Sequence, residues 1–256
     1  MNYQPIETKN YRKPKITKRP VAMLVIGIAI GVALAALAFL MTGMETQKNP
    51  GIIQTTKKNE LPDLNDSVGL AYNAMSSAVG EITGIGACTD TEIIIPKYID
   101  GLIVTSIAKH AFEGCGDIKS VIMPESVTKI GDYAFRECTG LTSIVIPKGV
   151  TNIGTSSFLG CESLANIAIP EGVTKIGISA FQGCKNLNSI TIPRSATVIE
   201  NYVFHGCGNL STINYSGNIS QWKNISKRTG WDTGTPDYTV YCADGSITKD
   251  GMIDYN

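Results

Sequence analysis

A phenylalanine followed three positions later by a cysteine recurs every twenty-three residues in the second half of this chain. The repeated phenylalanines are Phe112, Phe135, Phe158, Phe181 and Phe204, and the repeated cysteines are Cys115, Cys138, Cys161, Cys184 and Cys207. Apolar triplets that end at a proline keep the same spacing, as in Leu141, Ile144 and Ile146 before Pro147. A fixed period of this length predicts a stack of equivalent units, because each unit can bury its apolar face only against its neighbours.

The pattern within one unit predicts a β-rich solenoid of short parallel strands. In LTSIVIP, residues 141–147, Ile144 and Ile146 should point inward while Ser143 and Val145 point outward, because side chains alternate along a strand. Coils stacked about 4.8 Å apart place each Phe and each Cys above the previous one. We therefore expect the cysteines to fill the core as buried free thiols. Disulfides are the alternative, since stacked Cα atoms lie within bridging distance, but side chains in such a ladder point in parallel.

An uncharged apolar run at residues 21–41, VAMLVIGIAIGVALAALAFLM, predicts one transmembrane helix before the repeats. At about 1.5 Å per residue, a helix of this length spans roughly 31 Å, close to the apolar core of a bilayer. Residues 1–20 carry a net charge of +5, and basic flanks stay in the cytoplasm, so the repeats are expected outside the cell. A cleaved signal peptide is the alternative, because Ala36-Leu37-Ala38 resembles a cleavage site, but the run is longer than such peptides usually have.

These features divide the chain into four predicted parts. They are a cytoplasmic basic tail (1–20), a transmembrane helix (21–41), an extracellular stalk (42–78) and the solenoid (79–250), with caps at 79–111 and 214–250. Trp222 with Ile225 is expected to cover the open C-terminal end of the apolar stack. Gly27, Gly31 and Ala35 have the small-xxx-small spacing that lets membrane helices pair, which would support a weak helix-mediated homodimer, although small residues are common in such helices.

The repeat pattern LxxIxIPxxVTxIGxxAFxxC resembles the leucine-rich repeats of bacterial surface-antigen-like (BspA-like) proteins. Residues 82–96 are similar to the way such arrays begin, and residues 221–247 are similar to the segment that closes many of them. Glu200 departs from the pattern, because Gly is usual there. The resemblance implies a bacterial cell-surface binding module that adheres to protein or cell-surface partners. A structural or sensory ectodomain that partners other membrane proteins is the alternative.

The motifs of catalysis and of cofactor, metal and nucleic-acid binding are absent from the sequence. It contains no GxSxG, phosphate loop, paired-carboxylate motif or metal-ligand spacing, so we expect neither an enzyme nor a cofactor or metal. His110 and His205 stand in columns that vary from repeat to repeat, which is typical of exposed turn positions. The chain after residue 20 is net acidic with scattered lysines, which argues against nucleic acid as a partner.

The outward positions of the predicted strands form the candidate binding face. The first column is Ser120, Ser143, Asn166, Ser189 and Thr212, and the second is Ile122, Val145, Ala168, Thr191 and Asn214. A broad, flat and weakly polar surface favours a macromolecular surface partner, a protein or glycoprotein, over a small molecule. Small side chains in these columns also arise where bulk does not fit a curved sheet, and the sequence leaves that alternative open.

Overall fold

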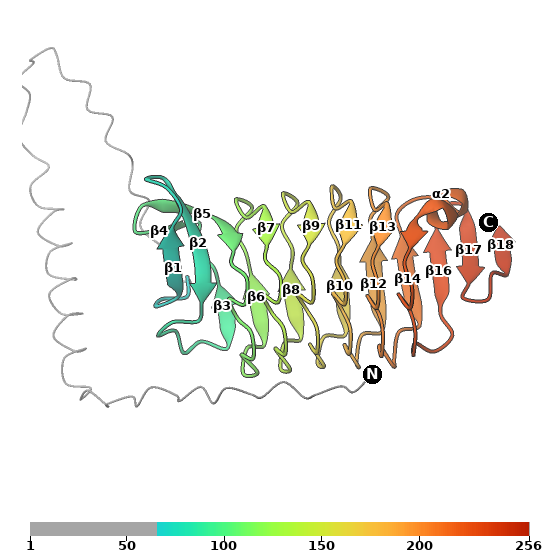
Figure 1. Cartoon of the computed structure of the whole chain (residues 1–256), viewed down its shortest axis with the longest axis horizontal. Coiled ribbons are helices and arrows are strands. Elements are labelled where there is room, and N and C mark those ends of the chain that lie inside the picture. Colours follow the sequence, from blue (N-terminus) through green and yellow to red (C-terminus); the bar gives the residue numbers. More distant parts are fainter. Residues whose placement is uncertain (1–65, 256) are drawn as a thin grey trace, which may run out of the picture. The chain divides into compact units, whose positions relative to one another are not determined.

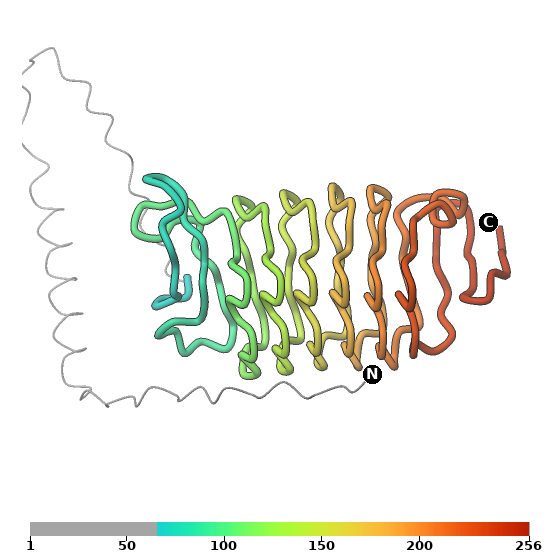
Figure 2. Tube along the Cα trace, in the orientation of Figure 1, coloured from blue at the N-terminus to red at the C-terminus, as the bar shows by residue number. Residues whose placement is uncertain are grey.

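The repeated apolar triplets form the strands of a β-solenoid of about seven turns (Figure 1). A computed structural model describes residues 66–255 of the chain. The predicted tail, the predicted membrane helix and most of the predicted stalk lie outside the described residues. Within residues 66–255, no helix is long and apolar enough to cross a membrane. The trace in Figure 2 shows successive coils of similar outline stacked side by side, as the fixed period predicts.

One long side of the solenoid carries the strands that end near the repeated prolines. They are β3 (Glu92–Ile94), β6 (Ser120–Ile122), β8 (Ser143–Val145), β10 (Asn166–Ala168), β12 (Ser189–Ile192), β14 (Thr212–Tyr215) and β16 (Thr239–Cys242). Neighbouring strands pair in parallel with a register of one full repeat, so that Ser120 lies beside Ser143 and Asn166 beside Ser189. The ladder is interrupted once, between β8 and β10, and forms two sheets, β3-β6-β8 and β10-β12-β14-β16-β17-β18.

A second row of short strands runs along the opposite side of the core. It comprises β5 (Leu102–Ile107), β7 (Lys129–Ile130), β9 (Asn152–Ile153), β11 (Lys175–Ile176), β13 (Val198–Ile199) and β15 (Ser226–Lys227). The second apolar pair of each repeat lies in or just before these strands, as Ile130 lies in β7 and Val127 precedes it, and both of those side chains are buried. Two rows of parallel strands therefore enclose one continuous core.

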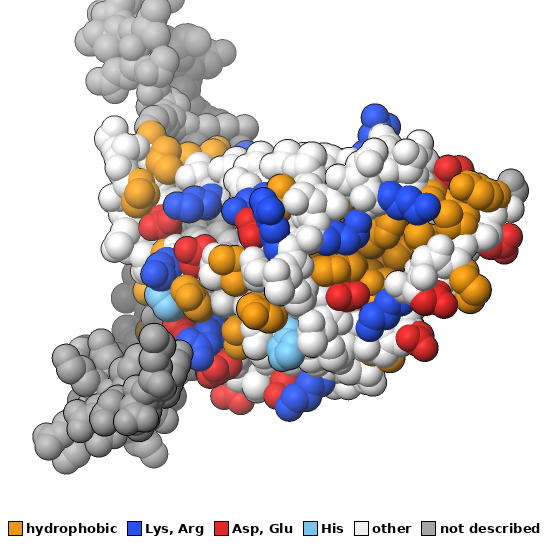
Figure 3. Space-filling view, turned by 45° about the vertical axis from the view of Figure 1, so that its right-hand side comes forward, with side chains coloured by type: hydrophobic (Ala, Val, Ile, Leu, Met, Phe, Trp, Pro, Cys, Tyr) orange, Lys and Arg blue, Asp and Glu red, His pale blue; other side chains and the backbone are white. Residues whose placement is uncertain are grey.

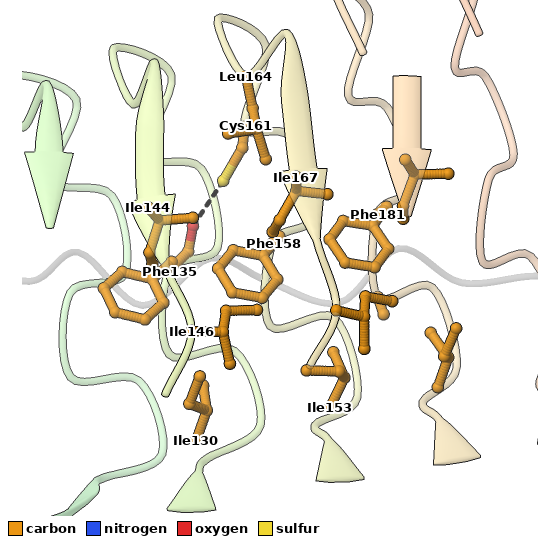
Figure 4. Close-up of a cluster of buried hydrophobic side chains, with 14 of the residues drawn as sticks. Ile130, Phe135, Ile144, Ile146, Ile153, Phe158, Cys161, Leu164, Ile167 and Phe181 are labelled. Carbon is orange, nitrogen blue, oxygen red and sulfur yellow. Dashed lines mark hydrogen bonds between the residues drawn. The ribbon is translucent and has the colours of Figure 1, made fainter. Parts of the chain in front are cut away.

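The core confirms the predicted alternation. Ile144 and Ile146 are buried, while Ser143 and Val145 between and beside them are exposed. The repeated phenylalanines stack face to face, with neighbouring ring centroids 5.2, 5.5, 5.4 and 5.9 Å apart. Figure 4 shows Phe135, Phe158 and Phe181 as successive rungs of this ladder, enclosed by isoleucines from both rows of strands.

The cysteine ladder makes a contact that the repeat pattern did not reveal. The thiol of Cys161 donates a hydrogen bond to the carbonyl oxygen of Phe135, 3.2 Å away in the preceding coil (Figure 4). Cys138, Cys184 and Cys207 donate in the same way to the phenylalanine of the preceding coil, at 3.1, 3.2 and 3.1 Å. All seven cysteines are free thiols. A Cys at this position thus fills a small apolar space and adds a second hydrogen bond to a carbonyl that already accepts one from a backbone N–H, as Phe135 does from Cys138.

The ends of the folded part lie beyond the predicted boundaries of 79 and 250. β1 (Ala71–Ala74), inside the predicted stalk, pairs antiparallel with β2 (Val79–Gly84), and β4 (Tyr98–Ile99) pairs antiparallel with β5. At the other end, β17 (Gly245–Thr248) and β18 (Ile253–Tyr255) form an antiparallel hairpin on β16. These hairpins depart from the twenty-three-residue spacing, so periodicity could not place them.

Ser157 is a buried polar side chain for which we expect substitution to be stabilising. Its hydroxyl has no hydrogen-bond partner in the described structure, and the matching positions in neighbouring coils are Ala134 and Ala180. Ser157→Ala should raise the free energy of unfolding by about 1 kcal/mol, because an unsatisfied buried hydroxyl is removed. Urea unfolding of both proteins measures the difference.

The matched control is the same substitution at Ser195. Its hydroxyl donates to the carbonyl of Val173 at 2.8 Å and accepts from the backbone N–H of Gly172 at 3.1 Å. Ser195→Ala should therefore lower the free energy of unfolding by about 1 kcal/mol. A loss of stability in both variants would contradict the assignment of Ser157 as unsatisfied.

Candidate binding face

The strand side of the solenoid presents the two predicted columns to solvent. In the first column Ser143 and Asn166 are exposed, while Ser120, Ser189 and Thr212 are half-buried. The second column is more exposed, and only Thr191 in it is half-buried. The parallel register aligns each column along the solenoid, because within each of the two sheets every parallel strand pairs with the next at the equivalent residue. The structure thus brings all ten residues onto one outward face.

Both columns continue into the caps, where sequence periodicity missed them. Thr239 lies beside Thr212 and Tyr241 beside Asn214, although the spacing there is not twenty-three residues. At the other end, Glu92 and Ile94 pair with Ser120 and Ile122. The face is therefore longer than the five repeats indicate, and no signal in the repeat spacing could have identified these additional residues.

The second column changes character along the solenoid. Ile122 and Val145 are 50% and 59% exposed, and Ala168 follows them, so this half of the column is apolar. Asn214 stands in the other half and donates from Nδ2 to the hydroxyl of Ser189 at 3.1 Å. The face thus offers an apolar half and a polar half to a partner.

A shallow depression of about 360 Å³ lies where the ladder is interrupted between β8 and β10. It is lined by Ile144, Val145, Ile146, Lys148, Ala168, Pro170 and Glu171. The lining is mostly apolar and includes one basic and one acidic side chain. Such a depression can accept a single protruding side chain of a partner, because it is open and small.

The turns on another side of the coils form a second, more polar hollow of about 500 Å³. Its lining includes Gly160, Gly183, Glu162, Gln182 and Lys185, and the Lys185 ammonium lies 2.7 Å from the carboxylate of Glu162. Side chains in this row differ in size and charge from coil to coil. It is the main alternative to the strand face as a contact surface.

The two histidines lie in different surroundings. His110 is exposed, as expected, and stacks on Tyr133 with ring centroids 4.8 Å apart. His205 is only half-buried rather than fully exposed, and its Nδ1 is buried with no hydrogen-bond partner in the described structure. His110 contacts the carboxylate of Glu113, and neither histidine lies beside a nucleophile among the described contacts.

The turn position of His110 and its equivalents in the other coils has a backbone conformation that the side chains there did not indicate. His110, Tyr133, Ser156, Ser179 and Tyr202 all adopt the left-handed region, with φ of 61, 59, 51, 54 and 60°. This conformation costs a residue with a side chain about 1–2 kcal/mol. The two serines of the column are buried, in contrast to the exposed His110. The strained turn is therefore a property of the coil, because side chains of different chemistry share it.

The C-terminal cap closes the apolar stack as predicted. Trp222 in α2 (Ile219–Asn224) is buried together with Ile225, and its ring contacts Tyr215 and Trp231. The ammonium of Lys227 lies 4.3 Å from the centre of the Trp222 ring, and burial lowers the pKa of Lys227 to about 8. Lys227 also donates to the carbonyl of Ile225, so its role in the cap is structural.

The charged surface has no single-sign patch on the side shown in Figure 3. Basic and acidic side chains alternate there, and hydrophobic side chains gather toward the right-hand side. Among residues 66–255, no cluster of histidine, cysteine or acidic side chains could hold a metal ion.

Comparisons with known proteins agree with this architecture. Residues 105–226 match the family model for the BspA type leucine rich repeat region, in six copies. A search of curated proteins finds no match. A leucine rich cell surface protein from Faecalibacterium prausnitzii is similar, with 38% identity and a TM-score of 0.57 over 61% of this chain and 40% of that one. A leucine rich repeat protein from T. pallidum is similar at 28% identity and a TM-score of 0.53, over 63% and 79%.

Proposed function

Because residues 105–226 are a BspA type leucine-rich repeat region, we propose that this chain is a bacterial cell-surface binding module that adheres to a protein or glycoprotein partner. Solenoids of this kind act as binding scaffolds, since stacked repeats create a long continuous surface. The similar protein from Faecalibacterium prausnitzii, of which this chain spans 40%, is described as a cell surface protein. That likeness supports the surface location.

The observation that carries the proposal is the strand face. Its first outward column consists of small side chains held in register by parallel strand pairing, and the depression beside it is shallow. A rigid surface loses little conformational entropy when it binds. A large partner can therefore gain affinity from many modest contacts along this face.

Arginine substitutions on the strand face test the binding surface. Ser143→Arg together with Asn166→Arg should lower capture of the partner at least about tenfold, because two long charged side chains would stand in the middle of a flat interface. The measurement is recovery of surface proteins from bacterial and host cell extracts on the immobilised full-length chain.

The control is a matched pair on the turn row, Gln182→Arg together with Lys185→Arg. Both residues line the polar hollow of the turns, so this pair tests the alternative surface directly. Capture should stay within about twofold of wild type. A loss with the turn pair, or equal losses with both pairs, would contradict binding on the strand face.

We further propose that residues 21–41 anchor the chain in the cell membrane as a single-pass helix, with the N-terminus in the cytoplasm. The uncharged run and its basic flank support this arrangement. Protease added to intact cells should then remove the repeats and leave residues 1–20 protected. A mature protein that begins near Phe39 would instead show cleavage and contradict the anchor.

A further inference from the structure

The residues that follow the strand prolines carry alternating charge along the solenoid. This exit column consists of Glu125, Lys148, Glu171 and Arg194, each directly after a proline. All four side chains are exposed, and none forms an ion pair with a residue of the described chain. Successive members belong to successive coils, so charges of opposite sign recur about every 5 Å along one margin of the strand face.

Two copies of the exit column that run in opposite directions can place opposite charges against each other. If two copies lie antiparallel with the two-fold axis between the coils of Lys148 and Glu171, each Lys148 faces Glu171 of the second copy. Each Glu125 then faces Arg194 of the second copy. Two-fold symmetry repeats every contact and closes the assembly at two chains.

The apolar surface beside the exit column fits the same axis. The depression at the interrupted ladder lies between the coils of Val145 and Ala168, and Lys148 and Glu171 stand at its margin. In the antiparallel pair, the exposed Val145 of one copy faces the small Ala168 of the other. A protruding side chain therefore meets a depression on both sides of the axis.

Shape distinguishes this register from the other one in which two different pairs of opposite charges face each other. An axis between the coils of Glu125 and Lys148 also pairs opposite charges, because Lys97 precedes Glu125 in the column. That register would place Ile122 against Val145, which are 50% and 59% exposed, so two large side chains would meet and neither would face a residue as small as Ala168. In addition, Lys97 already lies over the ring of Tyr98, at 5.1 Å from its centre.

We propose that the strand face binds a second copy of this chain, antiparallel, through the exit column and the apolar depression around Val145 and Ala168. The contact covers about four coils and is therefore small, at the low end of specific interfaces, and we expect a weak and salt-sensitive dimer. Confinement of both copies to one membrane would raise their effective concentration. The inference goes beyond the proposed function. Self-association is measured without any other partner, so the dimer and the proposed function can fail independently of each other.

Charge reversal on the full chain in a mild nonionic detergent tests the pairing. Lys148→Glu places like charges opposite each other twice, and we expect the dimer dissociation constant from sedimentation to rise at least about tenfold. The double variant Lys148→Glu with Glu171→Lys restores opposite charges across the axis and should return to within about threefold of wild type. Lys129→Glu, an exposed position in β7 on the other row of strands, makes the same charge change and should have no effect.

The three variants retain residues 21–41, so association through that segment contributes equally to all of them. A dissociation constant unchanged by Lys148→Glu would overturn the interface. A double variant as weak as the single one would overturn the antiparallel pairing. Wild-type protein that stays monomeric at all concentrations measured would overturn the proposal as a whole.

Zero-length cross-linking identifies the register. A carbodiimide joins a lysine amine to a carboxylate in direct contact, and a mixture of ¹⁴N- and ¹⁵N-labelled full chains separates links between copies from links within one. We expect mixed-isotope peptides that join Lys148 to Glu171, and their yield should fall at high salt. Mixed peptides that join Lys148 to Glu125 instead, or no mixed peptides, would overturn the register.

Discussion

Replacement of Phe158 by alanine should lower the free energy of unfolding of the solenoid by about 3–5 kcal/mol. The side chain is fully buried, and its ring stacks on Phe135 at 5.5 Å and on Phe181 at 5.4 Å. Removal of the ring leaves a cavity that the neighbouring coils cannot close, because their backbones are held in register by the strands on both sides. Denaturant unfolding monitored by circular dichroism measures the loss.

His205→Ala provides the comparison for this variant. His205 follows the last phenylalanine of the ladder but lies half-buried at the surface, and its buried Nδ1 has no partner that would be lost. We expect a change within about 0.5 kcal/mol. Equal losses of unfolding free energy for Phe158→Ala and His205→Ala would show that the phenylalanine ladder does not stabilise the core.

The buried thiols should react with maleimide at least about a thousandfold more slowly in the folded protein than after denaturation. Burial raises the pKa of Cys138 and of Cys207 from 9.0 to about 12, and raises the pKa of Cys161 and of Cys184 well above 9.0. The thiolate is the reactive form, so three units of pKa reduce the reactive fraction about a thousandfold, and burial blocks access as well. Labelling followed by mass spectrometry, with and without denaturant, measures both rates.

Cys115 and Cys242 serve as internal references for the labelling. Both are only half-buried, and burial raises the pKa of Cys242 to about 11, less than for Cys138. They should react before any of the four buried ladder thiols, Cys138, Cys161, Cys184 and Cys207, in the native protein. Labelling of Cys184 at the rate of Cys115, or a mass that shows disulfides, would contradict the ladder of free buried thiols.

The same pKa shifts predict how stability depends on pH. The folded state keeps its thiol protons to a higher pH than the unfolded state, in which these thiols ionise near 9. Stability is therefore unaffected by these groups below pH 9 and falls as the pH rises from 9 toward 12, by up to about 1.4 kcal/mol per pH unit for each such thiol. Unfolding measured between pH 7 and 11 follows this decline.

The sequence alone determined the architecture and the core of this protein. The recurrence of Phe112, Phe135 and their equivalents required a stack, because a single short coil cannot bury a phenylalanine by itself. Alternation within 141–147 assigned Ile144 inward and Val145 outward, since side chains alternate along any strand. Trp222 was likewise identified as part of the cap, because the open end of an apolar stack must be shielded from solvent.

The tertiary structure decided the contacts that the repeat spacing does not specify. The hydrogen bond from Cys161 to the carbonyl of Phe135 depends on how far one coil rises above the next, which no sequence pattern records. The continuation of the binding face to Thr239 depends on a cap that departs from the repeat spacing.

The interrupted ladder is the feature that sequence could least have foreseen. β8 and β10 have the same repeat pattern as their paired neighbours, and yet they are not hydrogen-bonded to each other. Small shifts of one coil against the next decide whether a ladder forms, and these shifts sum over the packing of every side chain in the stack. The depression between Val145 and Ala168 therefore exists only in the folded chain, while the charged residues beside it can be identified from the sequence.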